Sequence, residues 1–185
     1  VSSGLITESQ LDFRWEFWQR NSVVKNGGSN MKIGVFGTGY VGLVTGVCFA
    51  DMGNDVLCVD VDPQKIKMLW EGKSPIYEPG LDELLENNIK AKRIQFTTDS
   101  ATAIEQCDLL FIAVGTPSDV DGSADLKYVL QVAQTIGQHM KTYKLVINKS
   151  TVPVGTQKKV KDVIQAQLNQ RQLNLTVDVA SNPEF

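Results

Sequence analysis

The stretch KIGVFGTGYVG, residues 32–42, constrains the fold more than any other part of the sequence. An apolar run of strand-forming residues leads into glycines spaced as G-x-G-x-x-G, at Gly37, Gly39 and Gly42, and a helix-compatible segment follows. This order of strand, glycine loop and helix is typical of a βα unit that binds a dinucleotide. Gly37 would permit a tight turn, Gly39 would let a pyrophosphate approach the backbone, and Gly42 would let the helix pack closely on the strand. The N–H groups at the helix N-terminus would then face the phosphates.

Apolar strands and amphipathic helices alternate along the rest of the chain. The predicted strands are 32–36, 55–60, 93–97, 108–113, 143–148 and 175–180. The predicted helices are 40–53, 63–72, 79–90, 99–106, 125–141 and 155–170. Runs such as LLFIAV and KLVIN are apolar throughout, as in parallel strands that are covered on both faces. The sequence therefore predicts an α/β fold with a doubly wound, mostly parallel sheet and helices on both faces, a Rossmann-type dinucleotide-binding domain.

Two regions are predicted. Met31 directly precedes the first strand and is the expected natural start, so residues 1–30 are interpreted as a leader or an added extension. This extension contains the stretch VKNGGSN, whose glycine and serine favour a flexible linker. Residues 31–185 are predicted to form a single domain, a size that allows a sizeable core.

Composition excludes several classes of function. The net charge is -3, which argues against a nucleic-acid partner held by bulk charge. No apolar run reaches the roughly 18 residues that a membrane span needs. Cys48, Cys58 and Cys107 are widely spaced in apolar surroundings, so they are expected to be buried free thiols of a cytoplasmic protein. No metal site is predicted.

Asp60 is the candidate residue for recognition of the adenosine ribose. It ends the second predicted strand, 23 residues after Gly37, where a carboxylate accepts hydrogen bonds from the ribose hydroxyls. A 2′-phosphate would meet like charge there, so NAD is predicted over NADP. Asp62 is a second acid nearby, but its position before Pro63 favours a helix cap. Lys65 lies either near the ribose or on a solvated helix face.

The segment from Met31 to Phe185 resembles the amino-terminal domain of the UDP-glucose dehydrogenases, within the UDP-glucose/GDP-mannose dehydrogenase family. Five motifs carry the resemblance: MKIGVFGTGYVGLVTGVCFADMG, SPIYEPGLDELL, FIAVGTPSD, KSTVPVGT and SNPEF. Together they cover nearly all of residues 31–185. Other nucleotide-sugar dehydrogenases share the first and fourth motifs more loosely, so the second and third point to the UDP-glucose branch.

The resemblance implies an enzyme that oxidises UDP-glucose to UDP-glucuronate with two NAD. In this family an alcohol becomes an aldehyde, a cysteine captures it, and a second hydride transfer leaves a thioester for hydrolysis. That cysteine lies beyond the NPEF motif, in a second half that follows a central dimerisation helix. None of this chain's cysteines matches it, so the 185-residue chain is expected to bind NAD without oxidising the sugar. The parent protein is expected to be a homodimer.

The resemblance also implies roles for five residues. Glu184 matches the active-site glutamate that serves in acid/base work or positions water. Tyr40 and Val41 match residues near the nicotinamide and the substrate. Thr116 matches a residue beside the cofactor, and Thr151 matches one at the nicotinamide and the reacting sugar. Simpler interpretations stay open: a turn or helix cap for each threonine, and a solvated terminal residue for Glu184.

Three other interpretations are kept. The SPIYEPG stretch is interpreted as a rigid turn that serves packing. The substrate is alternatively another nucleotide sugar, such as a UDP-N-acetyl hexosamine. A domain of this fold could also sense NAD without catalysis, since fold does not imply function, although that alternative gives no reason for KSTVPVGT and SNPEF to occur together.

Overall fold

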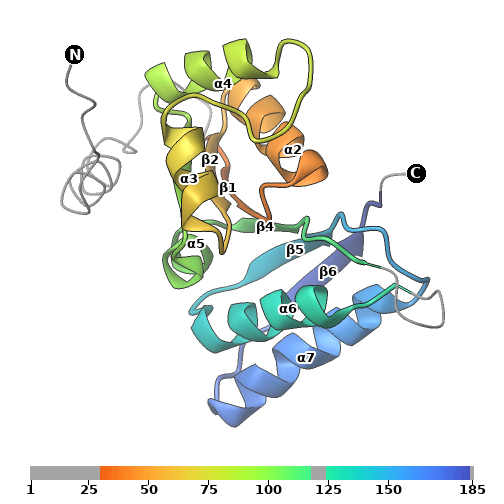
Figure 1. The fold of residues 1–185 in the computed structure, drawn as a ribbon. Helices are drawn as coiled ribbons and strands as arrows, with labels where there is room; N and C mark the ends of the chain where they lie inside the picture. Colours follow the sequence, from red (N-terminus) through yellow and green to blue (C-terminus); the bar gives the residue numbers. More distant parts are fainter. Residues whose placement is uncertain (1–29, 118–123, 184–185) are drawn as a thin grey trace. The chain divides into compact units, whose positions relative to one another are not determined.

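The computed structural model describes residues 30–117 and 124–183. Its strands form one six-stranded parallel sheet in the order β3-β2-β1-β4-β5-β6 (Figure 1). The strands are β1 (Lys32–Phe36), β2 (Asp55–Val59), β3 (Ile94–Thr97), β4 (Leu109–Ile112), β5 (Lys144–Asn148) and β6 (Val177–Ser181). The helices are α2 (Tyr40–Asp51), α3 (Pro63–Trp70), α4 (Leu81–Lys90), α5 (Ser100–Gln106), α6 (Lys127–His139) and α7 (Thr156–Gln170). The predicted fold class is confirmed, and each of these elements begins and ends within two residues of its predicted bounds.

The strand order places a reversal at the centre of the sheet. The chain builds outward from β1 to β2 and β3, and then returns to place β4 on the other side of β1. Phe36 at the end of β1 pairs with Val59 of β2 and with Ile112 of β4. Open α/β sheets bind ligands at such a switch point, beyond the carboxyl ends of the strands.

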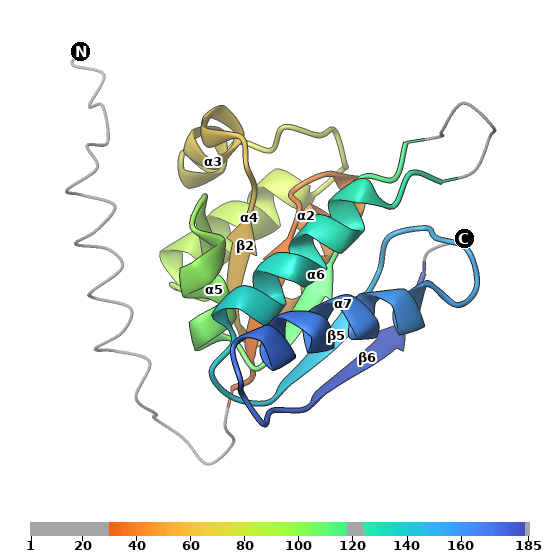
Figure 2. The same cartoon turned by 90° about the horizontal axis from the view of Figure 1, so that it is seen from below.

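Helices cover both faces of the sheet, so the central strands β1 and β4 are buried except at their first residues. Helices α2, α3 and α4 lie on one side, while α6 and α7 lie side by side on the other (Figures 1 and 2). Leu43 and Val47 of α2 and Leu69 of α3 join Ile33 and Val35 of β1 in one buried cluster. The apolar runs of the sequence are therefore explained by burial on both faces.

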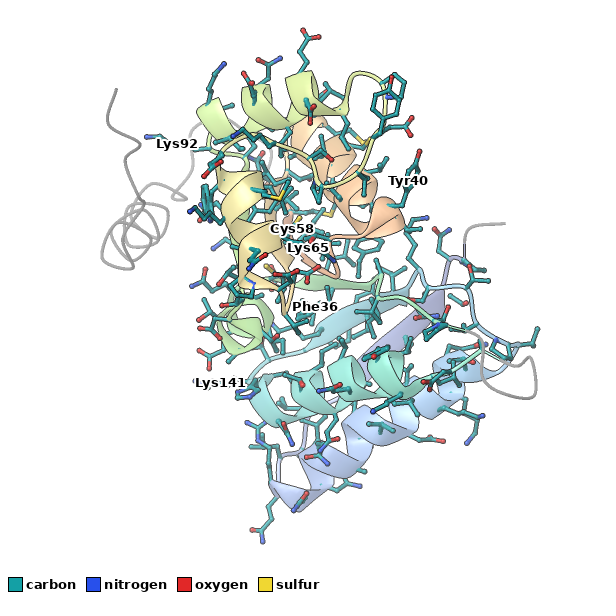
Figure 3. The ribbon with its side chains drawn as sticks, viewed as in Figure 1. Phe36, Tyr40, Cys58, Lys65, Lys92 and Lys141 are labelled. Carbon is teal, nitrogen blue, oxygen red and sulfur yellow. The ribbon has the colours of Figure 1, made fainter. Side chains whose placement is uncertain are left out.

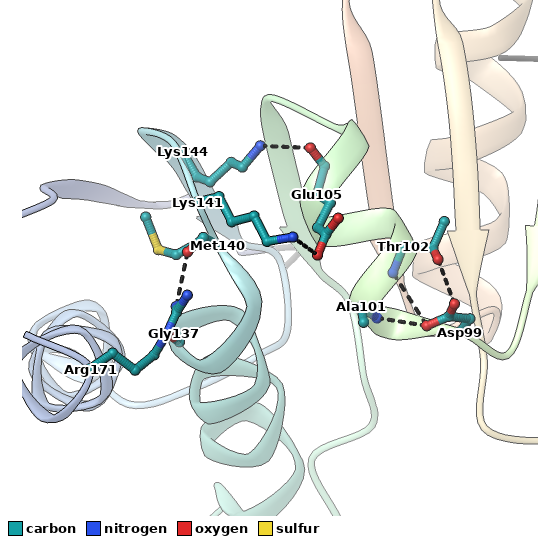
Figure 4. Close-up of polar contacts among 9 residues, drawn as sticks. All are labelled: Asp99, Ala101, Thr102, Glu105, Gly137, Met140, Lys141, Lys144 and Arg171. Carbon is teal, nitrogen blue, oxygen red and sulfur yellow. Dashed lines mark hydrogen bonds and ion pairs between the residues drawn. The ribbon is translucent and has the colours of Figure 1, made fainter. Parts of the chain in front are cut away.

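Two basic side chains contact the C-terminal ends of helices: Lys144, the first residue of β5, and Arg171, which follows α7. Lys144 is 1% exposed, and its Nζ donates to the Cys107 carbonyl oxygen at 2.7 Å, at the end of α5. The Arg171 Nη1 donates to the carbonyl oxygens of Gly137 (2.7 Å) and Met140 (2.9 Å), at the end of α6 (Figure 4). A cation is favourable at a helix C-terminus because unpaired carbonyl groups gather there. Burial lowers the pKa of Lys144 below its usual value.

The thiols differ from the prediction in one case. Cys58 and Cys107 are buried as expected, but Cys48 is exposed. Leu43, Val47 and Ala50 form the buried stripe of α2, and Cys48 follows Val47 by one residue, about 100° around the helix. The apolar sequence around Cys48 suggested burial because α2 is apolar on more than one side. Within the described residues, no helix is long and apolar enough to cross a membrane.

Candidate dinucleotide site

Two of the three loop glycines are required by the protein itself. Gly37 has a φ of +100°, and a Cβ on it would lie 2.6 Å from the Ala113 carbonyl oxygen. A Cβ on Gly42 would lie 1.9 Å from the carbonyl oxygen of Gly37. Side chains at these two positions would collide with backbone, so both glycines are explained by the tight turn and by the close approach of α2 to the loop.

Gly39 is different, because neither its backbone conformation nor its surroundings in the protein require a glycine. Its φ of -74° and ψ of -168° are open to any residue, and an added Cβ would have no heavy atom within 4 Å. Gly39 is the N-cap of α2, and no side chain caps this helix end. The loop therefore leaves open space beside the backbone N–H groups at the start of α2. This is the arrangement that a pyrophosphate group fits.

Asp60 lies beside this loop with its carboxylate held on both oxygens. The Thr38 backbone N–H and side-chain hydroxyl donate to Oδ2 at 2.9 Å and 2.6 Å, and the Asp62 N–H donates to Oδ1 at 3.0 Å. Burial by itself would raise the pKa of Asp60, but these hydrogen bonds and the nearby Lys65 ammonium outweigh it and leave the pKa below its usual value. The carboxylate is therefore charged at neutral pH.

Asp62 forms a helix cap, and Lys65 lies close to Asp60. The Asp62 side chain caps α3, accepting from the backbone N–H groups of Gln64 (2.8 Å) and Lys65 (3.4 Å), which confirms the predicted helix cap. The Lys65 Nζ lies 3.8 Å from Asp60 Oδ2, and its side chain stays partly exposed (Figure 3). Lys65 is thus placed at the candidate ribose site and is also reached by solvent.

Thr116 and Thr151 are brought together at the ends of the next two strands. The Thr116 hydroxyl donates to the Thr151 carbonyl oxygen at 2.9 Å. The loop of Thr151 is further fixed by Ser150, whose buried hydroxyl donates to the Val114 carbonyl oxygen at 2.7 Å. Thr151 does not cap α7, because that helix begins at Thr156 with Gly155 as its N-cap.

The stretch SPIYEPG does more than fill space. Ile76 packs against the core as predicted, but Tyr77 is 89% exposed. The hydroxyl of Tyr40 donates to the Glu78 carboxylate, which ties this turn to the first residue of α2. Val41, the next residue, packs against the buried cluster. The interpretation of the turn as packing therefore explains Ile76 and leaves Tyr77 and Glu78 unexplained.

The candidate residues share one edge of the sheet. The glycine loop follows β1, Asp60 follows β2, Thr116 follows β4 and Thr151 follows β5, and these strands are neighbours in the order β2-β1-β4-β5. Glu184 and residues 1–29 lie outside the described residues, so the predictions made for them stay predictions.

Comparison with known proteins decides the family. The model of the NAD binding domain of the UDP-glucose/GDP-mannose dehydrogenase family matches residues 31–185. The chain belongs to this family. The cofactor of the UDP-glucose/GDP-mannose dehydrogenases is NAD, and the space at Gly39 next to the charged Asp60 fits a dinucleotide with a free ribose.

Individual relatives agree with the family model. The chain is 53% identical over 154 residues to UDP-glucose 6-dehydrogenase TuaD of Bacillus subtilis, covering 83% of this chain and 33% of that protein. A solved UDP-glucose dehydrogenase from Pyrobaculum islandicum matches 88% of this chain and 38% of its own, at 38% identity and a TM-score of 0.79. A ternary complex of GDP-mannose dehydrogenase from Pseudomonas aeruginosa matches 84% of this chain and 36% of its own, at 38% identity and a TM-score of 0.77. The chain thus spans about a third of the length of the curated UDP-glucose 6-dehydrogenases of Bacillus subtilis (TuaD) and Pseudomonas aeruginosa.

Two polar residues of this family member were missed by the sequence reasoning. Thr38 stands inside the glycine motif, yet the motif assigns no role to that position. Ser150 stands inside KSTVPVGT, next to the residue that was singled out. Each is a buried hydroxyl that joins the ends of neighbouring strands. A polar residue within an otherwise apolar or glycine-rich stretch was the available signal.

Proposed function

We propose that this chain is the NAD-binding part of a UDP-glucose 6-dehydrogenase, an enzyme that oxidises UDP-glucose to UDP-glucuronate with two NAD. The observation that carries NAD binding is the open space at Gly39 beside a carboxylate that Thr38 holds in place. The choice of UDP-glucose rests on the curated relatives, among them the 53% identical enzyme from Bacillus subtilis.

The end of β1 and β2 would hold the adenosine half of the cofactor. The pyrophosphate would lie over Gly39, facing the N–H groups of the first turn of α2. Asp60 would accept hydrogen bonds from the ribose hydroxyls, and Lys65 would approach the same group from α3. The side chain of Val41 packs inward, so its expected role near the nicotinamide and the substrate would fall to its backbone N–H.

The end of β4 and β5 would hold the nicotinamide and the reacting sugar. A threonine hydroxyl can donate to one ligand oxygen and accept from another group, which suits a site where an alcohol becomes a carbonyl. We assign Thr116 to the cofactor and Thr151 to the cofactor and the reacting carbon, with Tyr40 nearby. Glu184 would act in acid/base work or position water during hydrolysis. Bound NAD would supply the hydride acceptor for each of the two oxidations.

The complete enzyme would need more than these residues. Hydride transfer requires the alcohol carbon to be held near the nicotinamide in a site that excludes water. Cys58 and Cys107 are buried, and Cys48 lies on α2, whereas the cysteine of the family lies beyond the NPEF motif, so none of the three is assigned as the nucleophile. We therefore propose that the 185-residue chain binds NAD without forming NADH. A homodimeric, cytoplasmic parent protein belongs to the same proposal.

Two measurements on the purified chain test this function. Calorimetry with NAD and NADP should show tighter binding of NAD, because a 2′-phosphate would face the charged Asp60. Mixing the chain with NAD and UDP-glucose should produce no steady rise in NADH absorbance, while a protein extended by its downstream sequence should give two NADH per UDP-glucose. Equal affinity for the two cofactors would refute the ribose site, and steady NADH production by the chain alone would refute the assignment of the chemistry.

Another nucleotide sugar is the second candidate substrate. The ternary complex of GDP-mannose dehydrogenase has the same 38% identity as the solved UDP-glucose enzyme. A UDP-N-acetylmannosamine dehydrogenase from Pyrococcus horikoshii is 31% identical with a TM-score of 0.76. An assay of the extended protein against a panel of these nucleotide sugars separates the candidates. Absence of NADH with every sugar would favour the alternative of a non-catalytic NAD-sensing domain.

A further inference from the structure

Thr38 is a buried polar residue at the point where the glycine loop meets Asp60. Its relative exposure is 0%, and it sits between Gly37 and Gly39. The backbone N–H and the hydroxyl both donate to the same carboxylate oxygen, Oδ2 of Asp60, across 22 residues of sequence. One loop residue therefore supplies two of the hydrogen bonds that hold the candidate ribose acceptor.

The two carboxylate oxygens of Asp60 accept different numbers of hydrogen bonds from the protein. Oδ2 accepts both Thr38 bonds and lies 3.8 Å from the Lys65 ammonium, while Oδ1 accepts the Asp62 N–H. A carboxylate oxygen accepts about two hydrogen bonds. Oδ2 is therefore filled by protein donors, and the capacity that remains for a ligand lies on Oδ1. The two Thr38 hydrogen bonds to Asp60 thus determine which edge of the carboxylate remains open to the cofactor.

We propose that Thr38 is a positioning residue that sets cofactor specificity through Asp60. Its hydroxyl fixes the rotation of the carboxylate about the Cβ–Cγ bond, so that Oδ1 is presented to the adenosine ribose 2′-hydroxyl. Without this hydroxyl the carboxylate is held only by the backbone N–H groups of Thr38 and Asp62, so it is less firmly ordered, and the ordering that a bound ribose then requires weakens binding. The inference rests on the proposed binding of NAD at this site. The inference goes beyond that proposal because it assigns the discrimination between NAD and NADP partly to Thr38, a residue that does not touch the ligand.

Three substitutions separate this role from a general effect on the loop. Thr38→Val removes the hydroxyl and keeps the branched shape and the backbone N–H, Thr38→Ser keeps the hydroxyl, and Thr38→Ala removes it in a smaller side chain. Calorimetry on the 185-residue chain should show NAD bound about tenfold more weakly by Thr38→Val and Thr38→Ala, the loss expected for one hydrogen bond to a charged group. Thr38→Ser should stay within about twofold of the wild type.

The ligands supply the second half of the test. With 2′-deoxy-NAD, which lacks the hydroxyl in question, Thr38→Val should bind like the wild type. NADP affinity should also stay unchanged, so the preference for NAD over NADP should shrink by the same factor of about ten. In an Asp60→Ala background, Thr38→Val should have little further effect, because Thr38 acts through that carboxylate.

The outcomes are distinguishable. Failure of the wild-type chain to bind NAD would overturn the proposed function and this inference with it. NAD binding by the wild type with unchanged affinity in both Thr38→Val and Thr38→Ala would overturn the inference alone. Equal losses for NAD and 2′-deoxy-NAD would show that Thr38 shapes the whole loop and does not aim Asp60. Melting temperatures of all variants, measured in parallel, confirm that each affinity belongs to folded protein.

Discussion

The two halves of the sheet's carboxyl edge are built in different ways. At the end of β1 and β2, Thr38 and Asp60 are buried and share two hydrogen bonds, of 2.6 Å and 2.9 Å. At the end of β4 and β5, Thr116 and Thr151 share one bond of 2.9 Å, and Thr151 and the nearby Val154 are exposed. In the first half the candidate ligand-binding residues are themselves buried, whereas in the second half the buried Ser150 holds the loop and Thr151 is exposed.

The difference bears on how affinity and chemistry are divided. A site whose acceptors are already held loses little freedom when a ligand binds. We therefore expect the β1–β2 end to supply most of the affinity for NAD. The β4–β5 end would orient the reacting groups, and it would do so together with whatever covers its exposed side chains. Substitutions at the two ends should accordingly have effects of different kind and size.

The largest effect is expected at Gly39. Gly39→Val would place a side chain in the proposed pyrophosphate space, so NAD affinity should fall by a hundredfold or more, on the order of 3 kcal/mol. The melting temperature should stay unchanged, since the backbone angles and the open space accept a side chain. Circular dichroism melting and NAD titration measure the two quantities. Unchanged affinity in the folded variant would show that the loop does not hold the phosphates.

Gly42 supplies the matched control for this test. A Cβ at Gly42 would meet the Gly37 carbonyl oxygen at 1.9 Å, so Gly42→Ala should lower the free energy of unfolding by about 3 kcal/mol, as overpacking does. Gly39→Val adds three carbon atoms and Gly42→Ala adds only one, yet the larger change should cost binding and the smaller change should cost stability. A stable Gly42→Ala would mean that α2 can move away from the loop.

Asp60→Ala should have the next largest effect. It removes the ribose acceptor, so NAD binding should weaken by about 1–3 kcal/mol, the range for hydrogen bonds to a charged group. It also leaves the buried hydroxyl and N–H of Thr38 without their carboxylate, so the free energy of unfolding should fall as well. Calorimetry and urea unfolding separate the two losses. A variant that is stable and binds NAD normally would remove the contrast between the two ends.

The charge of Asp60 makes the stability of the β1–β2 end depend on pH. Its pKa is lowered in the folded protein, so its contribution to stability should be complete above the unfolded pKa of about 4 and should be lost as the pH falls through the folded pKa below that value. The difference in urea midpoint between wild type and Asp60→Asn should therefore be constant from pH 7 to about pH 5 and shrink in more acidic buffers. A difference that grows on acidification would contradict the lowered pKa.

The smallest effect is expected at Thr116. Thr116→Val removes one hydrogen bond to the Thr151 carbonyl oxygen at a partly exposed position, so the free energy of unfolding should fall by less than about 1 kcal/mol. NAD affinity should change less than in Asp60→Ala. Urea unfolding and NAD titration test this, with Thr116→Ser as the control that retains the hydroxyl. A loss of affinity as large as that of Asp60→Ala would show that both ends are equally important for binding.

The fold was predictable because its signals are local. Apolar runs and glycine spacing placed every described strand and helix, and the motif order fixed the parallel sheet. The site was predictable where a residue type follows from backbone geometry, as at Gly37 and Gly42. Pairings set by side-chain direction were not: the Thr38 hydroxyl on Asp60 and the exposure of Cys48 depend on how elements distant in sequence are turned toward each other.

Lys144 has a consequence for the chemical reactivity of the folded chain. Its ammonium is enclosed and donates to the last carbonyl groups of α5, so an amine-directed reagent can reach it only when β5 separates from that helix. Lysines such as Lys90 and Lys158, whose side chains are well exposed, should be modified at once. The rate at which Lys144 acquires a label would therefore report how often β5 and α5 separate, without any probe being engineered into the protein.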